Sequence, residues 1–427
     1  MGRACPKPMK LIDEPVGAPA RAVSAPPAAP TFRWAYWACL ALIVALGAVL
    51  RLHPWAGFHG RGVDETMYIN YVTDLGKMHL TDYPEFCEHY LLQQSRSDLA
   101  MLPPTRFLYL YAAHAWHAAT GAPSQDALMA VSAWFTILSL LATAGFAHRI
   151  GGPGVSLATT ALMSVAMNQI HQAQHVMIDG FFTFWCLLAL WSLWEYLQRP
   201  DRWGWLAAYA ASLAAMVMTK ENSFFVVAAI CGLLVANRWL RFGTVSKPLL
   251  LMTVAGPLLG FVALVFLAGG IDVFLAIYRL LVAKSKVVPW AVINGDGPWY
   301  RYLIDLVIVS PLIVLLATGR AFQLRVTEKA PLLLLVFIGL TFALMANVKY
   351  GMNLRYATIW DMPLRFLATT QVLRLCARFR SRAVLVSACA IVALAAMELN
   401  QYRVFCVAHP SYALTDQELL RAVNILK

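Results

Sequence analysis

The chain has 427 residues, of which only 13% are charged and 60% are hydrophobic. Soluble domains carry about a quarter charged residues, and a soluble chain of this length would need that charge to cover several domains. The composition therefore excludes a water-soluble enzyme, a disordered protein and a small disulfide-bonded protein. It predicts an all-α polytopic membrane protein, because each spanning helix uses ~20 apolar residues.

The net charge of +12 does not predict a nucleic-acid partner, because the basic residues are scattered between apolar runs. Such a distribution is typical of topology determinants in membrane proteins. We also expect some of these cations to bind anionic groups. Of the eight cysteines, only Cys87 and Cys406 fall in segments predicted to lie outside the cell, and whether they pair stays open.

The N-terminal residues 1–33 are rich in Pro and Ala and are predicted to form a disordered cytoplasmic tail. The apolar run 35–50 lacks a convincing small-residue cleavage site, so it is predicted to be a retained span and not a signal peptide. Residues 34–400 are expected to form one transmembrane domain. Residues 401–427 are expected to form a short extracytoplasmic tail.

Two long connections are predicted on the outer side, at 53–125 and 269–302. The first is acidic and aromatic. Within it, residues 106–120 are apolar but interrupted by His114 and His117. This stretch is too short and too polar to span comfortably, so we expect a helix lying in the membrane interface.

Ten further apolar runs are predicted to span the membrane, each with ends uncertain by several residues. They are 126–147, 154–170, 178–197, 203–219, 222–237, 248–268, 303–318, 330–346, 357–373 and 383–398. With the first run they make eleven, and an odd number puts the two termini on opposite sides. Lys and Arg are denser on the tail and the short connections of one side, which predicts a cytoplasmic N-terminus.

The strongest candidate for chemistry is the pair Asp64 and Glu65, just beyond the first span. Adjacent carboxylates near a membrane surface can be held at different pKa values. One can then accept a proton while the other orients a substrate or binds a metal. The alternative interpretation is a pair of solvated loop acids.

A second candidate is the series His171, His175 and Asp179, which would share one face of a helix. Two His and a carboxylate are a workable metal-ligand set. No HExxH pattern occurs, however, so the sequence predicts no dedicated metal site and leaves a divalent cation only as an open cofactor. Asp179 is more informative, because a carboxylate that opens an apolar helix is costly unless it faces a cavity.

Outward cations are the third feature. Lys220 and Glu221 lie between two apolar runs that are too close for a real loop. The alternatives there are a snorkelling lysine or a cation that faces an aqueous cleft. Arg355 precedes a later span on the outer side, and its planar guanidinium suits a phosphate.

The outer connection 269–302 carries Arg279, Lys284 and Lys286 among aromatic residues. This pattern is typical of an interfacial aromatic belt. It would also suit the phosphate of a lipid whose tail lies in the membrane.

Taken in order, these motifs resemble a known family. A first span precedes Asp64-Glu65, Pro103-Pro104 precedes an aromatic helix, Asp179 opens a span, and another span closes on Thr219-Lys220. This order resembles the integral-membrane glycosyltransferases of the GT-C fold, within the protein O-mannosyltransferase and aminoarabinose-transferase superfamily. The resemblance covers about residues 35–240, with a weaker match from Asn353 to Pro363.

The resemblance implies a sugar donor on a polyprenyl phosphate and a lipid, glycan or protein acceptor. It implies transfer on the extracytoplasmic face of the plasma (bacterial inner) membrane, with membrane lipids as further partners. By the family pattern Asp64 is the catalytic residue, Glu65 its companion and Asp179 the second outer carboxylate. Donor-phosphate contacts are expected from Lys220, Arg279, Lys284, Lys286 and Arg355, and the substrate cleft from His175, Glu221 and Tyr356.

The chain departs from the family pattern in two places. It lacks the large soluble C-terminal domain of some relatives, which leaves the acceptor open. It also has Gln174-His175 where many relatives have an arginine before the aspartate, so the resemblance does not imply a donor contact at that point.

Chemically, the expected reaction needs cations for the phosphate leaving group and a general base for the acceptor oxygen. Asp64 is the predicted base, and inversion at the anomeric carbon is the expected outcome. The alternative is a transporter or flippase for a lipid-linked or anionic solute, with a scaffold protein as a third. The clustering of polar residues at the outer helix ends and the scarcity of acids within spans favour the enzyme.

Overall fold

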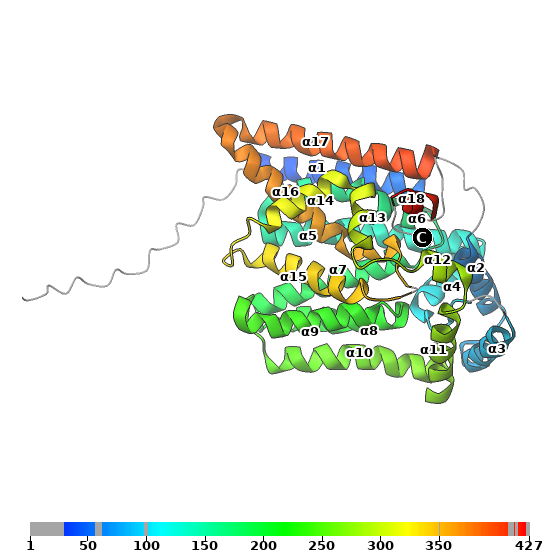
Figure 1. The fold of residues 1–427 in the computed structure, drawn as a ribbon. Helices are drawn as coiled ribbons and strands as arrows, with labels where there is room; N and C mark the ends of the chain where they lie inside the picture. Colours follow the sequence, from blue (N-terminus) through cyan, green and yellow to red (C-terminus); the bar gives the residue numbers. More distant parts are fainter. Residues whose placement is uncertain are drawn as a thin grey trace, which may run out of the picture.

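A computed structural model describes residues 30–55, 62–97, 101–349, 351–408, 414 and 417–423. The predicted tail 1–33 lies almost entirely outside this part of the chain. The described residues form helices and no strands, and the long helices lie side by side in a bundle (Figure 1). The predicted all-α architecture is confirmed.

Among the described residues, nine long helices build the bundle: α1 Pro30–Leu52, α5 Ser124–Ser164, α7 Asp179–Gln198, α8 Trp203–Thr219, α9 Ser223–Leu240, α10 Lys247–Leu267, α15 Lys329–Met345, α16 Asp361–Cys376 and α17 Ala383–Tyr402. Within the described ranges, six segments are long and apolar enough to cross a membrane, and three further apolar helices are shorter. The six segments are Trp34–Leu52, α5, α7, α9, α10 and Leu354–Ala408. The predicted total of eleven spans stays a prediction.

Helix α5 contains a reversal at Gly152, where φ is 81°. Beyond this point the hydroxyl of Ser156 donates a hydrogen bond to the carbonyl of Ala144, so the two halves fold back on each other. The positive φ favours glycine, which has no Cβ to clash. The predicted spans 126–147 and 154–170 correspond to these halves, although the second ends at Ser164 and is followed by α6, Met167–Gln174.

The predicted span 303–318 is wrong as a continuous helix. It is divided into α13, Arg301–Val309, and α14, Pro311–Ala321. Ser310 between them has φ −144° and ψ 58°. Proline lacks an N–H and disfavours the helical conformation of the residue before it, which explains the break.

Short helices gather at one end of the bundle, on the right of Figure 1. They are α2 Val63–Leu75, η1 Leu80–Asp82, α3 Tyr83–Arg96, α4 Phe107–Thr120, α6, α11 Ile271–Ser285, α12 Pro289–Asn294, α13 and α18 Gln417–Ala422. The short basic connections after α7, α9, α14 and α16 lie at the opposite end. The polar and the basic connections are thus separated as the sequence predicts.

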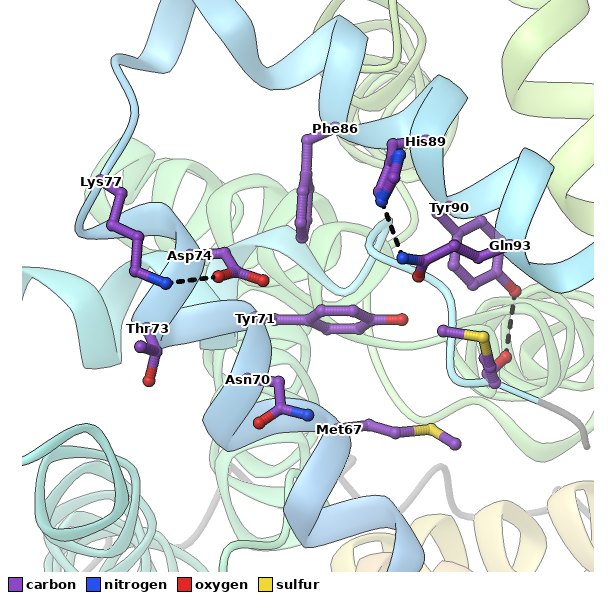
Figure 2. A pocket seen from close by; sticks show the side chains of 11 residues that line it. Met67, Asn70, Tyr71, Thr73, Asp74, Lys77, Phe86, His89, Tyr90 and Gln93 are labelled. Atoms are coloured by element: carbon purple, nitrogen blue, oxygen red, sulfur yellow. Dashed lines mark hydrogen bonds and ion pairs between the residues drawn. The ribbon is translucent and has the colours of Figure 1, made fainter.

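Helices α2 and α3 face each other within this group of short helices (Figure 2). The Tyr71 and Phe86 rings meet edge to face, with centroids 5.4 Å apart. Cys87 on α3 is buried, and both Cys87 and Cys406 are free thiols.

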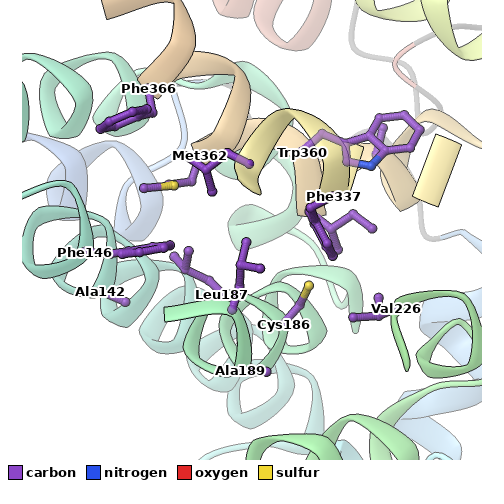
Figure 3. Close-up of a cluster of buried hydrophobic side chains, with 14 of the residues drawn as sticks. Ala142, Phe146, Cys186, Leu187, Ala189, Val226, Phe337, Trp360, Met362 and Phe366 are labelled. Atoms are coloured by element: carbon purple, nitrogen blue, oxygen red, sulfur yellow. The ribbon is translucent and has the colours of Figure 1, made fainter. Parts of the chain in front are cut away.

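The largest apolar cluster fills the space between α5, α7, α9, α15 and α16 (Figure 3). Its large members include Phe146, Leu187, Phe337, Trp360 and Phe366. The buried Trp360 satisfies its indole N–H by donating to the Thr341 hydroxyl at 2.7 Å. This core holds η2, Leu354–Trp360, against the bundle.

Helices α8 and α10 pack closely through two glycines of α10. A Cβ atom added at Gly256 or Gly260 would lie 2.8 or 2.6 Å from a carbonyl oxygen of α8. Small residues four positions apart allow such close backbone approach between membrane helices. This packing fixes the end of α8, where Lys220 follows.

Buried ionic groups within the bundle contradict the expectation that acids within spans are scarce. Arg365 contacts the Asp361 carboxylate at 2.7 Å and the Glu398 carboxylate at 2.5 Å. Ser310 also donates to Glu398, at 2.9 Å. Because each charge has a partner, the acids Asp361 and Glu398 are tolerated inside the segment 354–408.

Candidate active site

Helix α2 begins immediately after Gly62, whose backbone is extended. The Gly62 N–H donates to the Glu65 carboxylate at 2.8 Å, so Glu65 satisfies one of the unpaired donors at the helix start. Helix formation from Val63 places Asp64 in the first turn. Asp64 therefore lies at the end of the bundle where the short helices gather.

The other carboxylate oxygen of Glu65 ties α2 to the segment between α6 and α7. It accepts from the Val176 N–H at 2.9 Å and contacts His175 Nδ1 at 3.1 Å. Burial raises the pKa of Glu65, but the hydrogen bonds from His175, Gly62 and Val176 outweigh it and hold the pKa below its usual value. Glu65 is only 5% exposed, so its charge acts mainly on neighbouring backbone and on His175.

Arg355, from η2, reaches both predicted outer carboxylates. Its Nη2 atom lies 2.7 Å from Asp64 Oδ2, and its Nε atom lies 3.7 Å from Asp179 Oδ2. Asp179 is the first residue of α7 and is buried. Arg355 thus connects α2, α7 and η2 through charge.

Lys220 completes the group from the end of α8. Its ammonium group donates to Asp179 Oδ1 and lies 4.0 Å from the centroid of the Tyr356 ring. This distance is within the range of a cation–π interaction. Lys220 is 2% exposed, and burial lowers its pKa although Asp179 opposes the shift. We call Asp64, Asp179, Lys220 and Arg355 the charged cluster.

The electrostatics of the charged cluster favour an ionised Asp64. Burial raises the pKa of Asp64, but the positive charges of Arg355, Arg106 and Lys220 together hold it below its usual value. In this state Asp64 is a carboxylate at neutral pH. Its basicity is reduced as long as Arg355 remains its partner.

Arg106 is a residue that the sequence analysis missed. It precedes α4 and pairs with Glu221 through two contacts, at 3.3 Å and 3.0 Å. It also donates to the Tyr68 hydroxyl. The signal in the sequence was an arginine directly before the aromatic interfacial helix, together with Glu221, an acid between two apolar runs that had no assigned partner.

Three predicted phosphate contacts lie on α11 or directly after it. Lys284 on α11 donates to the Ser97 carbonyl, and the side chains of Arg279 and Lys286 are exposed. Among the ion pairs found in the described ranges, none joins these three residues to Asp64 or Asp179. Their contribution to donor binding stays a prediction.

The two histidines and Asp179 do not converge as a ligand set. The His171 and His175 rings are tilted at 48° to each other with centroids 4.4 Å apart, and His175 contacts Glu65. Asp179 instead faces Lys220 and Arg355. The part of the chain that the structure describes contains no group of three His, Cys, Asp or Glu residues placed to hold a metal ion.

The family comparison matches part of this site. Residues 121–292 match the family described as dolichyl-phosphate-mannose-protein mannosyltransferase. This range includes Asp179 and Lys220 of the charged cluster but neither Asp64 nor Arg355. A comparison with curated proteins found no match.

Solved structures show the same fold over most of the chain. ArnT from Cupriavidus metallidurans, in the apo state, is 17% identical with a TM-score of 0.54, covering 87% of this chain and 66% of its own. The same protein bound to undecaprenyl phosphate is 14% identical with a TM-score of 0.51, and the match covers 93% of this chain and 78% of the ArnT chain. The Archaeoglobus fulgidus oligosaccharyltransferase AglB, in complex with an inhibitory peptide and a dolichol-phosphate, is 12% identical with a TM-score of 0.56. The match covers 90% of this chain and 57% of the AglB chain.

These similarities confirm the resemblance drawn from the motif order. The chain has the fold of ArnT and of the archaeal oligosaccharyltransferase, which is the GT-C fold expected from the motif order. It spans about two thirds of apo ArnT and little more than half of the archaeal enzyme.

Proposed function

We propose that this protein is an integral-membrane glycosyltransferase that transfers a sugar from a polyprenyl-phosphate-linked donor to an acceptor on the extracytoplasmic face. The observation that carries the proposal is the charged cluster. Two cations and two carboxylates from four separate segments meet at the end of the bundle that carries the long polar connections. Solved neighbours that bind undecaprenyl phosphate or dolichol-phosphate support a lipid-phosphate donor.

The donor phosphate would bind Lys220 and Arg355. Both cations now contact carboxylates, and the two non-bridging oxygens of the donor phosphate offer the same charge-assisted contacts. The ring of Tyr356 lies beside both cations and limits their positions. Positive groups held at this point stabilise the charge that develops on the leaving phosphate during transfer.

Asp64 would act as the general base toward the acceptor oxygen. In the free protein Arg355 lowers the pKa of Asp64, while burial acts in the opposite direction. A donor phosphate that draws Arg355 away from Asp64 would remove the nearest cation that lowers this pKa. Burial would then raise the pKa of Asp64, and Asp64 would become a stronger base. The base would then be activated when the donor is in place. A single base with no covalent intermediate gives inversion.

The remaining predicted site residues would hold this arrangement. Glu65 and His175 fix α2 against the start of α7. Glu221 binds Arg106, which adds a further positive charge near Asp64. We place these residues in positioning roles.

The test uses the purified protein in detergent with undecaprenyl-phosphate-linked radiolabelled sugars, including mannose, glucose and aminoarabinose. Envelope fractions from cells that lack the protein serve as acceptor. We expect label transfer with one donor and a lost mass increment in the envelope of the deficient cells. No transfer from any donor, combined with undecaprenyl phosphate binding that is unchanged by Lys220→Ala and Arg355→Ala, would refute the proposal.

A further inference from the structure

A cavity lies between α2 and α3, and no residue of the charged cluster lines it (Figure 2). Its volume is about 310 Å³, at the lower end of the range for small-molecule sites. The side chains that line the cavity include those of Asn70, Tyr71, Phe86, His89 and Gln93. The predicted mechanism uses none of them.

The inner wall of this cavity is aromatic and fixed. The Tyr71 hydroxyl donates to the Leu102 carbonyl at 2.6 Å, and the Tyr90 hydroxyl donates to the Met101 carbonyl at 3.0 Å. The half-buried Phe86 ring stands nearly perpendicular to Tyr71, at an interplanar angle of 86°. These contacts hold an apolar surface open beside solvent.

The rim of the cavity is polar and carries little free charge. Asn70, His89 and Gln93 are exposed, and the Gln93 amide lies 2.7 Å from His89 Nε2. Lys77 contacts Asp74 at 3.0 Å, so the rim's cation and carboxylate face each other. Amide and imidazole groups offer both donors and acceptors to a neutral ligand.

The cavity shares α2 with the candidate base. Asp64 lies in the first turn of this helix, and Asn70 lies six residues further along. At the helical rise per residue this corresponds to about 9 Å along the axis. The cavity and Asp64 are therefore close along the axis of α2, although the side chains of Asp64 and Asn70 point about 120° apart around it.

We propose that this cavity binds a saccharide unit of the acceptor, an inference that rests on the proposed glycosyl transfer. A sugar ring presents an apolar C–H face, suited to Phe86 and Tyr71, and hydroxyl groups, suited to Asn70, His89 and Gln93. A peptide acceptor would be better served by an exposed strand edge or by pockets for apolar side chains. The cavity's aromatic wall and neutral polar rim favour the saccharide.

The test is saturation-transfer-difference NMR on the purified full-length protein in detergent. The probes are methyl α-mannoside, methyl α-glucoside and N-acetylglucosamine, with the peptide N-acetyl-Ala-Thr-Ala-amide as comparator. We expect signals from at least one saccharide that fall about fivefold or more in Phe86→Ala and in Gln93→Ala, since a central contact is worth more than 1 kcal/mol. Asn70→Ala supplies a variant with little risk to folding, because its side chain is exposed.

Glu85→Ala is the matched control, because Glu85 is exposed on α3 and does not line the cavity. Binding of undecaprenyl phosphate should be unchanged in all four variants. Its loss in Arg355→Ala alone tests the donor site separately. The inference is overturned if no saccharide gives a signal, if the cavity variants leave the signal unchanged, or if only the peptide signal depends on them.

Discussion

Arg355 contacts Asp64 at 2.7 Å, although the two residues come from opposite halves of the chain. Asp64 lies in the first turn of α2, and Arg355 lies in η2 shortly before α16. The same guanidinium reaches Asp179 at 3.7 Å. A guanidinium shared by two carboxylates can exchange one of them for a phosphate. This ion pair therefore couples the proposed donor site to the proposed base.

Asp64→Asn should abolish sugar transfer while leaving folding and donor binding intact. The amide cannot accept the acceptor's proton, and general-base catalysis contributes about 10²–10⁴-fold. The measurement is the rate of label transfer, together with undecaprenyl phosphate affinity. Glu88→Gln, an exposed acid on α3, is the control. Wild-type rates in Asp64→Asn would remove Asp64 from the mechanism.

Arg355→Ala should weaken donor binding more than acceptor binding. The change removes a planar cation that can contact a phosphate through two N–H groups, and charge-assisted hydrogen bonds are worth about 1.5–3 kcal/mol. The KM for each substrate, measured separately, reports the difference. Arg374→Ala, an exposed arginine in the last turn of α16 and outside the charged cluster, should change neither. Equal effects on both substrates would argue against a phosphate contact.

Arg355→Ala should also shift the acidic limb of the activity profile. Arg355 is the largest of the influences that lower the pKa of Asp64, and burial raises it. Removing the cation therefore raises the pKa, and Asp64 becomes protonated at a higher pH than in the wild type. The residual kcat/KM, plotted against pH, should decline at a higher pH. An unmoved acidic limb would show that another group limits the rate.

Glu65→Gln should destabilise the protein by about 1–3 kcal/mol, the usual cost of leaving buried hydrogen-bonding groups poorly satisfied. The folded pKa of Glu65 is lowered, so its charge stabilises the fold above the ordinary value of 4.5. That contribution is lost as the pH falls from 4.5 through the folded value. Thermal unfolding in detergent should therefore depend on acidic pH more weakly in Glu65→Gln than in the wild type. Identical pH dependence would refute the assigned contacts.

Arg365→Met should lower stability strongly without removing a group from the charged cluster. It leaves Asp361 and Glu398 buried without their shared cation, which typically costs about 3–5 kcal/mol. The unfolding temperature should fall, whereas donor affinity of the folded fraction should persist. In the triple variant Asp361→Asn, Arg365→Met, Glu398→Gln, much of the stability should return. A stable Arg365→Met single variant would contradict this role.

Several features of the fold followed directly from the sequence. Apolar runs of sufficient length predicted the bundle, and the interrupted run at 106–120 predicted the short helix α4. These properties are local, because hydrophobic length and helical preference depend on consecutive residues. The break at Ser310 is equally local, because Pro311 directly follows it in the sequence.

The candidate site could be predicted only in part from the sequence. Asp64, Asp179, Lys220 and Arg355 each stood out as charges beside apolar segments, and the structure brings these four together. The cations of α11 stood out for the same reason, but no ion pair found among the described residues joins them to this cluster. A charged residue beside an apolar segment indicates that the charge needs a partner. The sequence does not indicate which residue that partner is.

The sequence by itself determined that the chain forms a helical bundle for a membrane and that acids and cations collect at one end of it. Only the tertiary structure decided that Arg355 pairs with Asp64, that Arg106 pairs with Glu221, and that α2 and α3 enclose a polar cavity. The physical reason is that apolar burial depends on neighbours along the chain. Ion pairing depends on the packing of distant helices, where a small change in position exchanges one partner for another.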